Sequence, residues 1–476
     1  MKAFTEPLLS LAGFEEMTKT AEKSSGLISV TGCIDAQKSQ MIYAFGGHRK
    51  NKLIVTFGEQ KAKELYDEYS FFDKEVVYYP SKDVLFYQSD IRGNLLTAER
   101  IRALKAIREQ ESVTLVTTFD ALMNTMAPIE KMWENVLTLE QGQLLDLKEI
   151  QAALIRMGYE KEYQVQTMGQ FSVRGGILDV FPLTEENPIR IELWGDEIDT
   201  IRYFDCESQK SIENIDWVSI YPAAELVLSD EEKAGGIEKL KAEAKRVSDK
   251  LRKQMKTEEA HRVTVMADEL TEEWGELSMY AGMDAFLSYF FDERVGILDY
   301  FNPSDSLIFF DELTRCAEQG KLTETEFSES MKQRLTMGYI LPGQMNGLFT
   351  EKEIVAKLGK YSCIALGALD NKANGLHQLG SYGIHCQSVS PYNNSFELLI
   401  KDLKRYKKNG YRVILLSGSR TRAKRLSEDI TDQGITCFYT ENYDHELFEG
   451  QIMVCYGKVR RGFEYPILKF AVITES

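Results

Sequence analysis

The sequence predicts an α/β protein that carries an inserted antiparallel β domain, and three observations support this fold class. Short β-branched runs alternate with helical periodicity towards both ends of the chain, which is typical of a parallel sheet flanked by helices. Between these regions, strand-like runs follow one another too closely for crossover helices. The 476 residues, of which 43% are hydrophobic and 28% charged, exceed what one core holds and predict three or four units.

The first unit is an α/β lobe, expected over residues 1–127 and completed by residues 223–350. The completing part opens with a charged stretch, 230–274, whose pattern is that of a solvated amphipathic helix pair. Alternating strands and helices predict a parallel sheet. Its strands are expected at 26–31, 52–57, 76–79, 113–117 and 306–310, and its helices from residue 36, at 59–69 and at 98–110.

The second unit, residues 128–222, interrupts this lobe. From Phe171 the chain reads FSVRGGILDVFPLTEENPIRIELWGDEIDTIRYFD, with turn signals at 174–176, 183–188 and 195–196. Strands this close together predict an antiparallel meander, which makes the unit an inserted β-rich α+β domain.

An additional α/β domain is expected over residues 351–476. Strands are predicted at 411–416, 435–439 and 452–455, with a helix at 421–431 that follows a Gly-Ser turn. The sequence ends in FAVITES, an apolar strand-like run without a polar tail. We therefore expect the chain to be a piece of a longer protein.

Charge and cysteine usage restrict the classes of partner and the compartment. A net charge of −17 disfavours DNA binding over the whole surface, because phosphate neutralisation supplies most of that affinity. Lys458, Arg460 and Arg461 form one local basic cluster, which is either a phosphate contact or, as we favour, a solvated turn. Seven cysteines without a CxxC pair and five scattered histidines predict free thiols in a reducing cytoplasm and no metal site. No run approaches the ~18 apolar residues of a membrane span.

One motif is a near match to a phosphate-binding P-loop. The segment from Gly32 to Ser39, GCIDAQKS, follows a strand and opens a helix, and it fits GxxxxGK[ST] except that Gln37 replaces the second glycine. A side chain at that position strains the loop and fills space close to the phosphates. Asp35 adds a negative charge beside an anion site.

The usual companion of a P-loop is present as well. The run LIFFDE is an apolar strand that ends in Asp311 and Glu312, the residue types that hold magnesium and position water. The pair predicts a degenerate RecA- or helicase-like lobe whose nucleotide site is empty. The alternative is a working ATPase that uses Lys38, Ser39 and the two acids. The residues of this degenerate site are Gly32, Gln37, Lys38, Ser39, Asp311 and Glu312.

A tryptophan is predicted on a charged face of the inserted sheet. In the run RIELW, period-two alternation places Ile191 and Leu193 towards the core and Arg190 and Trp194 on the opposite face. Arg174, on the neighbouring strand, can join the same surface. A large aromatic among charges is typical of a protein-binding hot spot, and the alternative is a tryptophan tucked under its own hairpin.

The stretch MGQFSVRGGILDVFP, at 168–182, and IRIELWGDEIDTIRYFD after it resemble the insert domain shared by UvrB and the transcription-repair coupling factors (the Mfd family). The resemblance covers nearly the whole chain, including the order of domains. It implies docking to UvrA, the damage-recognition ATPase of nucleotide excision repair. By position, it assigns UvrA contacts to Arg174, Arg190 and Trp194, although the family often has another aromatic in place of the tryptophan.

Two departures from UvrB favour the coupling factors. Gln37 breaks the P-loop, and the stretch 78–96 is too short and too poor in aromatic residues to be the Tyr-rich hairpin with which UvrB enters damaged DNA. The resemblance then implies a non-enzymatic N-terminal module without cofactor. In the full-length family, RNA polymerase and DNA are bound by later domains, and an ATP- and magnesium-dependent motor translocates along double-stranded DNA. The alternative is a UvrB-like enzyme that binds ATP or DNA.

Overall fold

In the computed structural model, which describes residues 1–47, 49–82, 94–276, 282–370, 375–393 and 395–475, the first lobe is built on a seven-stranded sheet. All neighbouring strands in the order β15-β1-β14-β13-β2-β4-β3 are parallel. The strands are β1 (Gly26–Thr31), β2 (Asn51–Thr56), β3 (Val77–Tyr79), β4 (Val113–Thr118), β13 (Ser306–Asp311), β14 (Ser362–Leu366) and β15 (Gln378–Gly383).

Helices cover both faces of this sheet, which explains why its strands are apolar throughout. Along β2, Leu53 and Val55 belong to one buried cluster and Ile54 to another, so that two cores lie on opposite faces. The helices of the lobe are α1 (Lys2–Thr5), α2 (Phe14–Lys23), α3 (Asp35–Gly46), α4 (Glu59–Tyr69), α5 (Asn94–Glu109), α6 (Phe119–Met123), α7 (Ile129–Glu134), α12 (Leu313–Thr336) and α13 (Glu351–Leu358).

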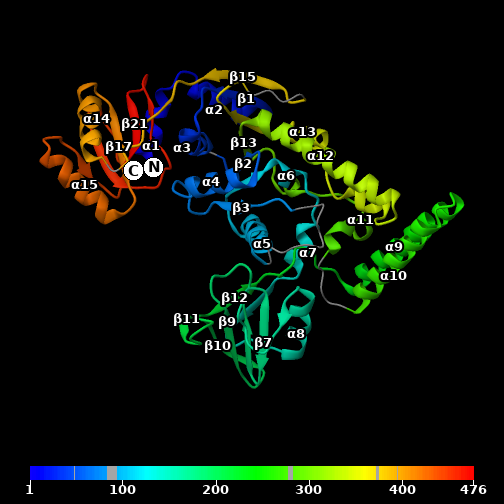
Figure 1. Cartoon of the computed structure of the whole chain (residues 1–476). Helices are drawn as coiled ribbons and strands as arrows, with labels where there is room; N and C mark the ends of the chain where they lie inside the picture. Colours follow the sequence, from blue (N-terminus) through cyan, green and yellow to red (C-terminus); the bar gives the residue numbers. More distant parts are fainter. Residues whose placement is uncertain (48, 83–93, 277–281, 371–374, 394, 476) are drawn as a thin grey trace.

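The inserted domain is a separate β-rich body with its own core (Figure 1). Its strands follow the order β11-β10-β9-β8-β7-β6, antiparallel except for the β6–β7 pair, and a two-stranded β12–β5 sheet and helix α8 (Leu147–Arg156) complete it. The strands are β5 (Leu137–Glu140), β6 (Glu160–Lys161), β7 (Gln170–Arg174), β8 (Ile177–Val180), β9 (Ile189–Trp194), β10 (Glu197–Phe204), β11 (Ser211–Ile215) and β12 (Trp217–Ile220).

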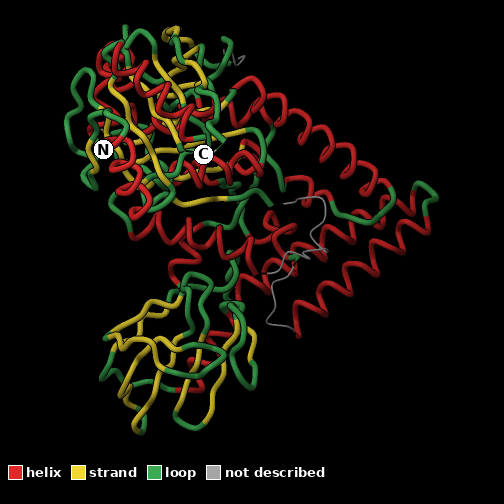
Figure 2. Tube along the Cα trace, turned by 60° about the vertical axis from the view of Figure 1, so that its left-hand side comes forward, coloured by secondary structure: helices red, strands yellow, loops and turns green. Residues whose placement is uncertain are grey.

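A helical hairpin, α9 (Asp230–Lys253) and α10 (Thr257–Glu276), projects from the lobe (Figures 1 and 2). Ser229 and Glu232 form a capping box that fixes where α9 begins. An apolar cluster runs along the hairpin, from Trp274 to Leu251 and Ala260 near the connection of the two helices, and helix α11 (Leu287–Phe290) contributes to it. The exposed outer faces agree with the solvated helix pair expected from the sequence.

The last domain has a mixed six-stranded sheet in the order β16-β20-β21-β17-β19-β18. Its apolar side chains merge with those of the first lobe in one buried cluster, so that Phe4 of α1 shares a core with Leu416 and Phe470. The elements are β16 (Gln387–Ser388), α14 (Phe396–Lys408), β17 (Arg412–Ser417), α15 (Arg420–Asp432), β18 (Phe438–Tyr439), β19 (Ile452–Tyr456), β20 (Phe463–Tyr465) and β21 (Phe470–Thr474).

The predicted fold class is confirmed, but one expected boundary differs. The additional domain does not start at residue 351, because α13, β14 and β15 belong to the first lobe and both strands pair with β1. Of the stretch 78–96 compared with the UvrB hairpin, residues 83–93 lie outside the described residues. No helix in the described part of the chain is long and apolar enough to cross a bilayer.

Candidate functional site

Two arginines on the outer face of the inserted sheet hold one buried carboxylate. The register of β8 and β9 places Asp179 opposite Arg190. The Arg190 guanidinium donates from Nε to Oδ1 of Asp179 at 2.7 Å and from Nη2 to Oδ2 at 2.8 Å. Arg174 on β7 donates to the same Oδ2 at 3.0 Å. Asp179 therefore joins two of the three predicted docking residues, and its side chain is only 1% exposed.

Arg190 is largely occupied inside the chain. It also donates to Gln209 at 2.8 Å, and its guanidinium lies 4.2 Å from the centre of the Phe204 ring. The hydrogen bonds that Arg190 donates to Asp179 are the main reason why the pKa of Arg190 is raised. Its side chain is 12% exposed, against 37% for Arg174. The resemblance assigns Arg190 a contact with UvrA, but in the structure Asp179 already satisfies the bidentate geometry of its guanidinium through Nε and Nη2.

Trp194 lies at the end of β9 and is 85% exposed. The turn that follows it passes through Gly195, whose φ of +66° suits glycine, and leads into β10. The alternative of an indole tucked under its own hairpin is wrong. An indole this exposed is available to a partner, as a hot-spot residue must be.

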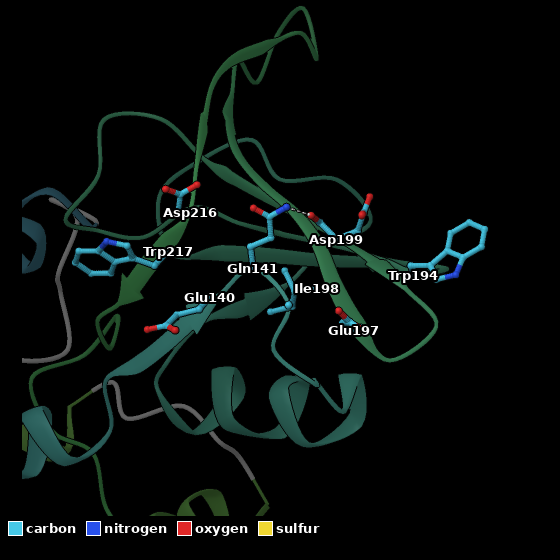
Figure 3. Close-up of a pocket in the computed structure, with 9 residues that line it drawn as sticks. Glu140, Gln141, Trp194, Glu197, Ile198, Asp199, Asp216 and Trp217 are labelled. Carbon is cyan, nitrogen blue, oxygen red and sulfur yellow. Dashed lines mark hydrogen bonds between the residues drawn. The ribbon is translucent and has the colours of Figure 1, made fainter.

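An open depression adjoins Trp194, and its lining was not predicted from the sequence. Figure 3 shows Trp194 and Trp217 at opposite ends, with the acidic side chains between them. Trp217, on β12, is 61% exposed. A sequence signal for the exposed Trp217 was available in the alternation of β12. It points Val218 and Ile220 inwards and therefore Trp217 outwards. The lining residues are Glu140, Gln141, Gly142, Trp194, Glu197, Ile198, Asp199, Asp216 and Trp217.

The P-loop lysine is held by acids. Lys38 Nζ lies 3.0 Å from Asp35 Oδ1, 2.5 Å from Asp311 Oδ1 and 3.0 Å from Glu312 Oε1, and its side chain is 1% exposed. Burial alone would lower the pKa of Lys38, but the three carboxylates, Asp311 above all, raise it. Likewise, burial of Asp35 is outweighed by Lys38 and Lys61, which lower its pKa to about 2. The lysine, which a nucleotide site needs for phosphate, is neutralised within the chain.

The loop itself is also closed. The backbone N–H groups of Gly32 and Cys33 donate to the carbonyls of Ala368 and Gly367, at 3.2 and 3.0 Å, instead of pointing into a phosphate cradle. Gly32 has a φ of +75°, and a Cβ there would collide with the carbonyl oxygen of Ile384. The Gln37 side chain is fully buried, without a hydrogen bond to any described residue. These residues do not fit a nucleoside triphosphate with its magnesium ion.

The other members of the predicted nucleotide site are likewise engaged. Asp311 accepts a hydrogen bond from Thr56 Oγ1 at 2.8 Å, and Glu312 accepts one from the Ala368 N–H at 3.2 Å. The hydroxyl of Ser39, the magnesium ligand of a working P-loop, lies 3.5 Å from Glu68 on α4. The structure therefore brings Lys38, Asp311 and Glu312 together, as the motif predicts, but as an ion cluster.

One residue of the basic cluster at 458–461, Arg460, lies against α4. Arg460 Nη1 is 2.8 Å from Glu64 Oε1, and its Nε is 3.9 Å from Glu68 Oε1. The Arg460 side chain remains 53% exposed. This pairing supports an inter-domain contact over a free phosphate-binding patch.

Comparisons with known proteins found a family model that matches the inserted domain and relatives that are similar to most of the chain. Residues 137–226 match the model of the UvrB interaction domain. The chain is 27% identical over 425 residues to the transcription-repair-coupling factor of Bacillus subtilis, which covers 89% of this chain and 36% of the relative. The factors of Staphylococcus haemolyticus and Staphylococcus aureus are each 26% identical, over 94% and 97% of this chain and 38% and 39% of their own lengths.

The chain therefore spans less than two fifths of the length of these relatives. The matched domain begins with β5 and continues past β12, so it contains Asp179, both of its arginines, Trp194 and the acidic depression. Residues 137–226 are a match to the UvrB interaction domain, and over most of its length the chain is similar to the transcription-repair-coupling factors.

Proposed function

We propose that this chain is a UvrA-docking module of a transcription-repair coupling factor, which recruits nucleotide excision repair to stalled RNA polymerase. The observation that carries the proposal is the exposed Trp194 within a domain that matches the UvrB interaction domain. Arg174 would add a polar contact beside it, since its side chain is partly exposed. Arg190 would act mainly by fixing Asp179 and Phe204, with its remaining N–H groups turned to the partner.

The test is the affinity of the 476-residue chain for UvrA. Trp194→Ala is expected to weaken binding by about 30-fold, because truncation of a hot-spot aromatic costs ~2 kcal/mol or more. Tyr163→Ala is the matched control, since Tyr163 is 83% exposed on the same domain and does not line the depression. Arg190→Ala is less diagnostic because it leaves the buried Asp179 short of a partner. Equal affinities of the Trp194 and Tyr163 variants would contradict the proposal.

We further propose that this part of the factor works without ATP or magnesium. The capture of Lys38 by three carboxylates and the closed loop at Gly32 support this. RNA polymerase binding and ATP-driven translocation on double-stranded DNA would then belong to other regions of such a factor. A cytoplasmic location agrees with the seven cysteines, all of which are free thiols.

A further inference from the structure

Carboxylates on two neighbouring surfaces of the inserted domain differ in how they are paired. On the outer sheet face, Asp179 is held by two arginines, and Glu192 is paired with Arg202, whose Nη1 lies 3.1 Å from its Oε2. In the depression next to Trp194, the four acids form no ion pair with any residue in the described ranges. These four are Glu140, Glu197, Asp199 and Asp216, and all of them are exposed.

The depression therefore concentrates negative charge that the chain itself does not neutralise. Among the described residues, no lysine or arginine lines it. Uncompensated carboxylates in a hollow attract cations and repel nucleic-acid phosphates. A negative surface of this kind is complementary to a lysine- or arginine-bearing polypeptide segment.

Exposed aromatic side chains accompany this charge. Trp194 and Trp217 lie at the two ends of the depression (Figure 3) and are 85% and 61% exposed. Tryptophan is highly buried on average, and it is enriched among interface anchors. A guanidinium can also stack on an indole while it pairs with carboxylates. The exposed tryptophans and the unpaired carboxylates therefore favour the same occupant, an arginine-bearing polypeptide segment.

We propose that the docking surface continues from Trp194 into the depression, where Glu140, Glu197, Asp199 and Asp216 receive a basic segment of UvrA and Trp217 is a second anchor. The inference rests on the proposed function and specifies the chemistry of the partner. It also adds negative charge to the recognition. On the outer face two arginines share the single carboxylate of Asp179, whereas the four acids of the depression have no ion-pair partner among the described residues.

The experiment measures UvrA association and affinity at several salt concentrations with a neutralised 476-residue chain, Glu140→Gln, Glu197→Gln, Asp199→Asn and Asp216→Asn. The expected result is association slowed by about tenfold or more at low salt, with a flatter salt dependence. Trp217→Ala is expected to weaken affinity at every salt concentration. The matched control neutralises four exposed acids elsewhere on the domain, Glu149→Gln, Glu160→Gln, Glu162→Gln and Glu186→Gln, with the same change in net charge.

Outcomes separate this inference from the proposed function. If Trp194→Ala weakens binding but the depression variant behaves like its control, the inference is overturned and the docking function stands. If the depression variant and Trp217→Ala weaken binding while the control does not, the inference is supported. If the unaltered chain does not bind UvrA, both proposals fail.

Discussion

Lys38 lies at the centre of the ion cluster that occupies the P-loop-like segment. A buried ammonium is stable only while its carboxylate partners remain, because the loss of one charge of a buried pair leaves the other uncompensated. Phosphate would have to displace Asp35, Asp311 and Glu312 from the lysine. The amides of Gly32 and Cys33 would also have to leave their carbonyl partners.

Restoring the missing glycine should therefore not restore nucleotide binding. Gln37→Gly removes the buried side chain, but it leaves the lysine cluster and the loop hydrogen bonds in place. Equilibrium titration with labelled ATP and magnesium is expected to show no saturation up to about 1 mM for the unaltered chain or the variant. A protein with an intact P-loop is the positive control.

Either kind of saturation has a distinct meaning. Tight binding by the variant alone would show that the Gln37 side chain was the whole obstacle. Tight binding by the unaltered chain would refute the proposal of a lobe without ATP.

At the scale of elements, an ionic joint fixes the segment that follows the inserted domain to the rest of the lobe. Glu225 follows the last inserted strand, and its carboxylate accepts two hydrogen bonds from Arg100 of α5. Nε donates at 2.6 Å and Nη2 at 3.1 Å. Lys82 reaches the same carboxylate at 3.0 Å and Asp284 at 2.7 Å. Burial would raise the pKa of Glu225, but Arg100 and then Lys82 outweigh it and lower the pKa. The joint links four segments that are distant in sequence.

Breaking one side of this joint should destabilise the protein strongly. Arg100→Met is expected to cost about 3–5 kcal/mol of unfolding free energy, because among the described residues Glu225 then keeps Lys82 alone as an ion-pair partner while it stays buried. Thermal and denaturant unfolding measure the effect. The double variant Arg100→Met with Glu225→Gln is the control, and it should recover part of the loss because the unpaired charge is gone. Equal stability of the single variant and the unaltered chain would contradict this role.

The elements themselves were largely predictable because their signals are local. β1 at 26–31 and α4 at 59–69 were predicted with the observed bounds. The predicted helix at 98–110 begins one turn earlier, at Asn94, and the predicted strand at 435–439 is reduced to Phe438–Tyr439. Ends of elements depend on tertiary contacts and caps, which periodicity does not encode.

At the scale of the whole molecule, the last domain rests on the first lobe beside the P-loop-like segment. Arg460 reaches α4 at Glu64 and approaches Glu68, and Glu68 in turn contacts Ser39. Burial raises the pKa of Glu68 to about 7, supported by the charges of Asp35 and Glu64 and opposed by Lys61 and Arg460. This inter-domain contact should therefore respond to pH near neutrality.

The sign of that response follows from the raised pKa. The ordinary pKa of a glutamate is 4.5, and that of Glu68 in the folded protein is about 7. Between these two pH values, Glu68 is protonated in the folded state and ionised in the unfolded state. Its contribution to stability therefore falls as pH rises through this range. Glu68→Gln should match the unaltered chain near pH 5 and exceed its stability near pH 8, by at most about 3 kcal/mol. Thermal unfolding at the two pH values measures the difference.

Glu64→Gln is the matched control with the opposite sign. The hydrogen bond from Arg460 lowers the pKa of Glu64, so this variant should lose stability at neutral pH and approach the unaltered chain as pH falls below about 4.5. If Glu68→Gln equals the unaltered chain at both pH values, Glu68 is not the titrating group of this contact.

The sequence by itself determined the fold class, the inserted antiparallel domain and the broken P-loop. Each of these depends on periodicity or on a short motif, and both act over a few residues. Only the tertiary structure decided which charges are already paired. Lys38, for example, donates a hydrogen bond to Asp311, which lies 273 positions later in the sequence. It also decided that β14 and β15 join β1, and that unpaired acids gather between Trp194 and Trp217. The selection of one non-local partner among many carboxylates follows from packing in three dimensions, which local patterns do not specify.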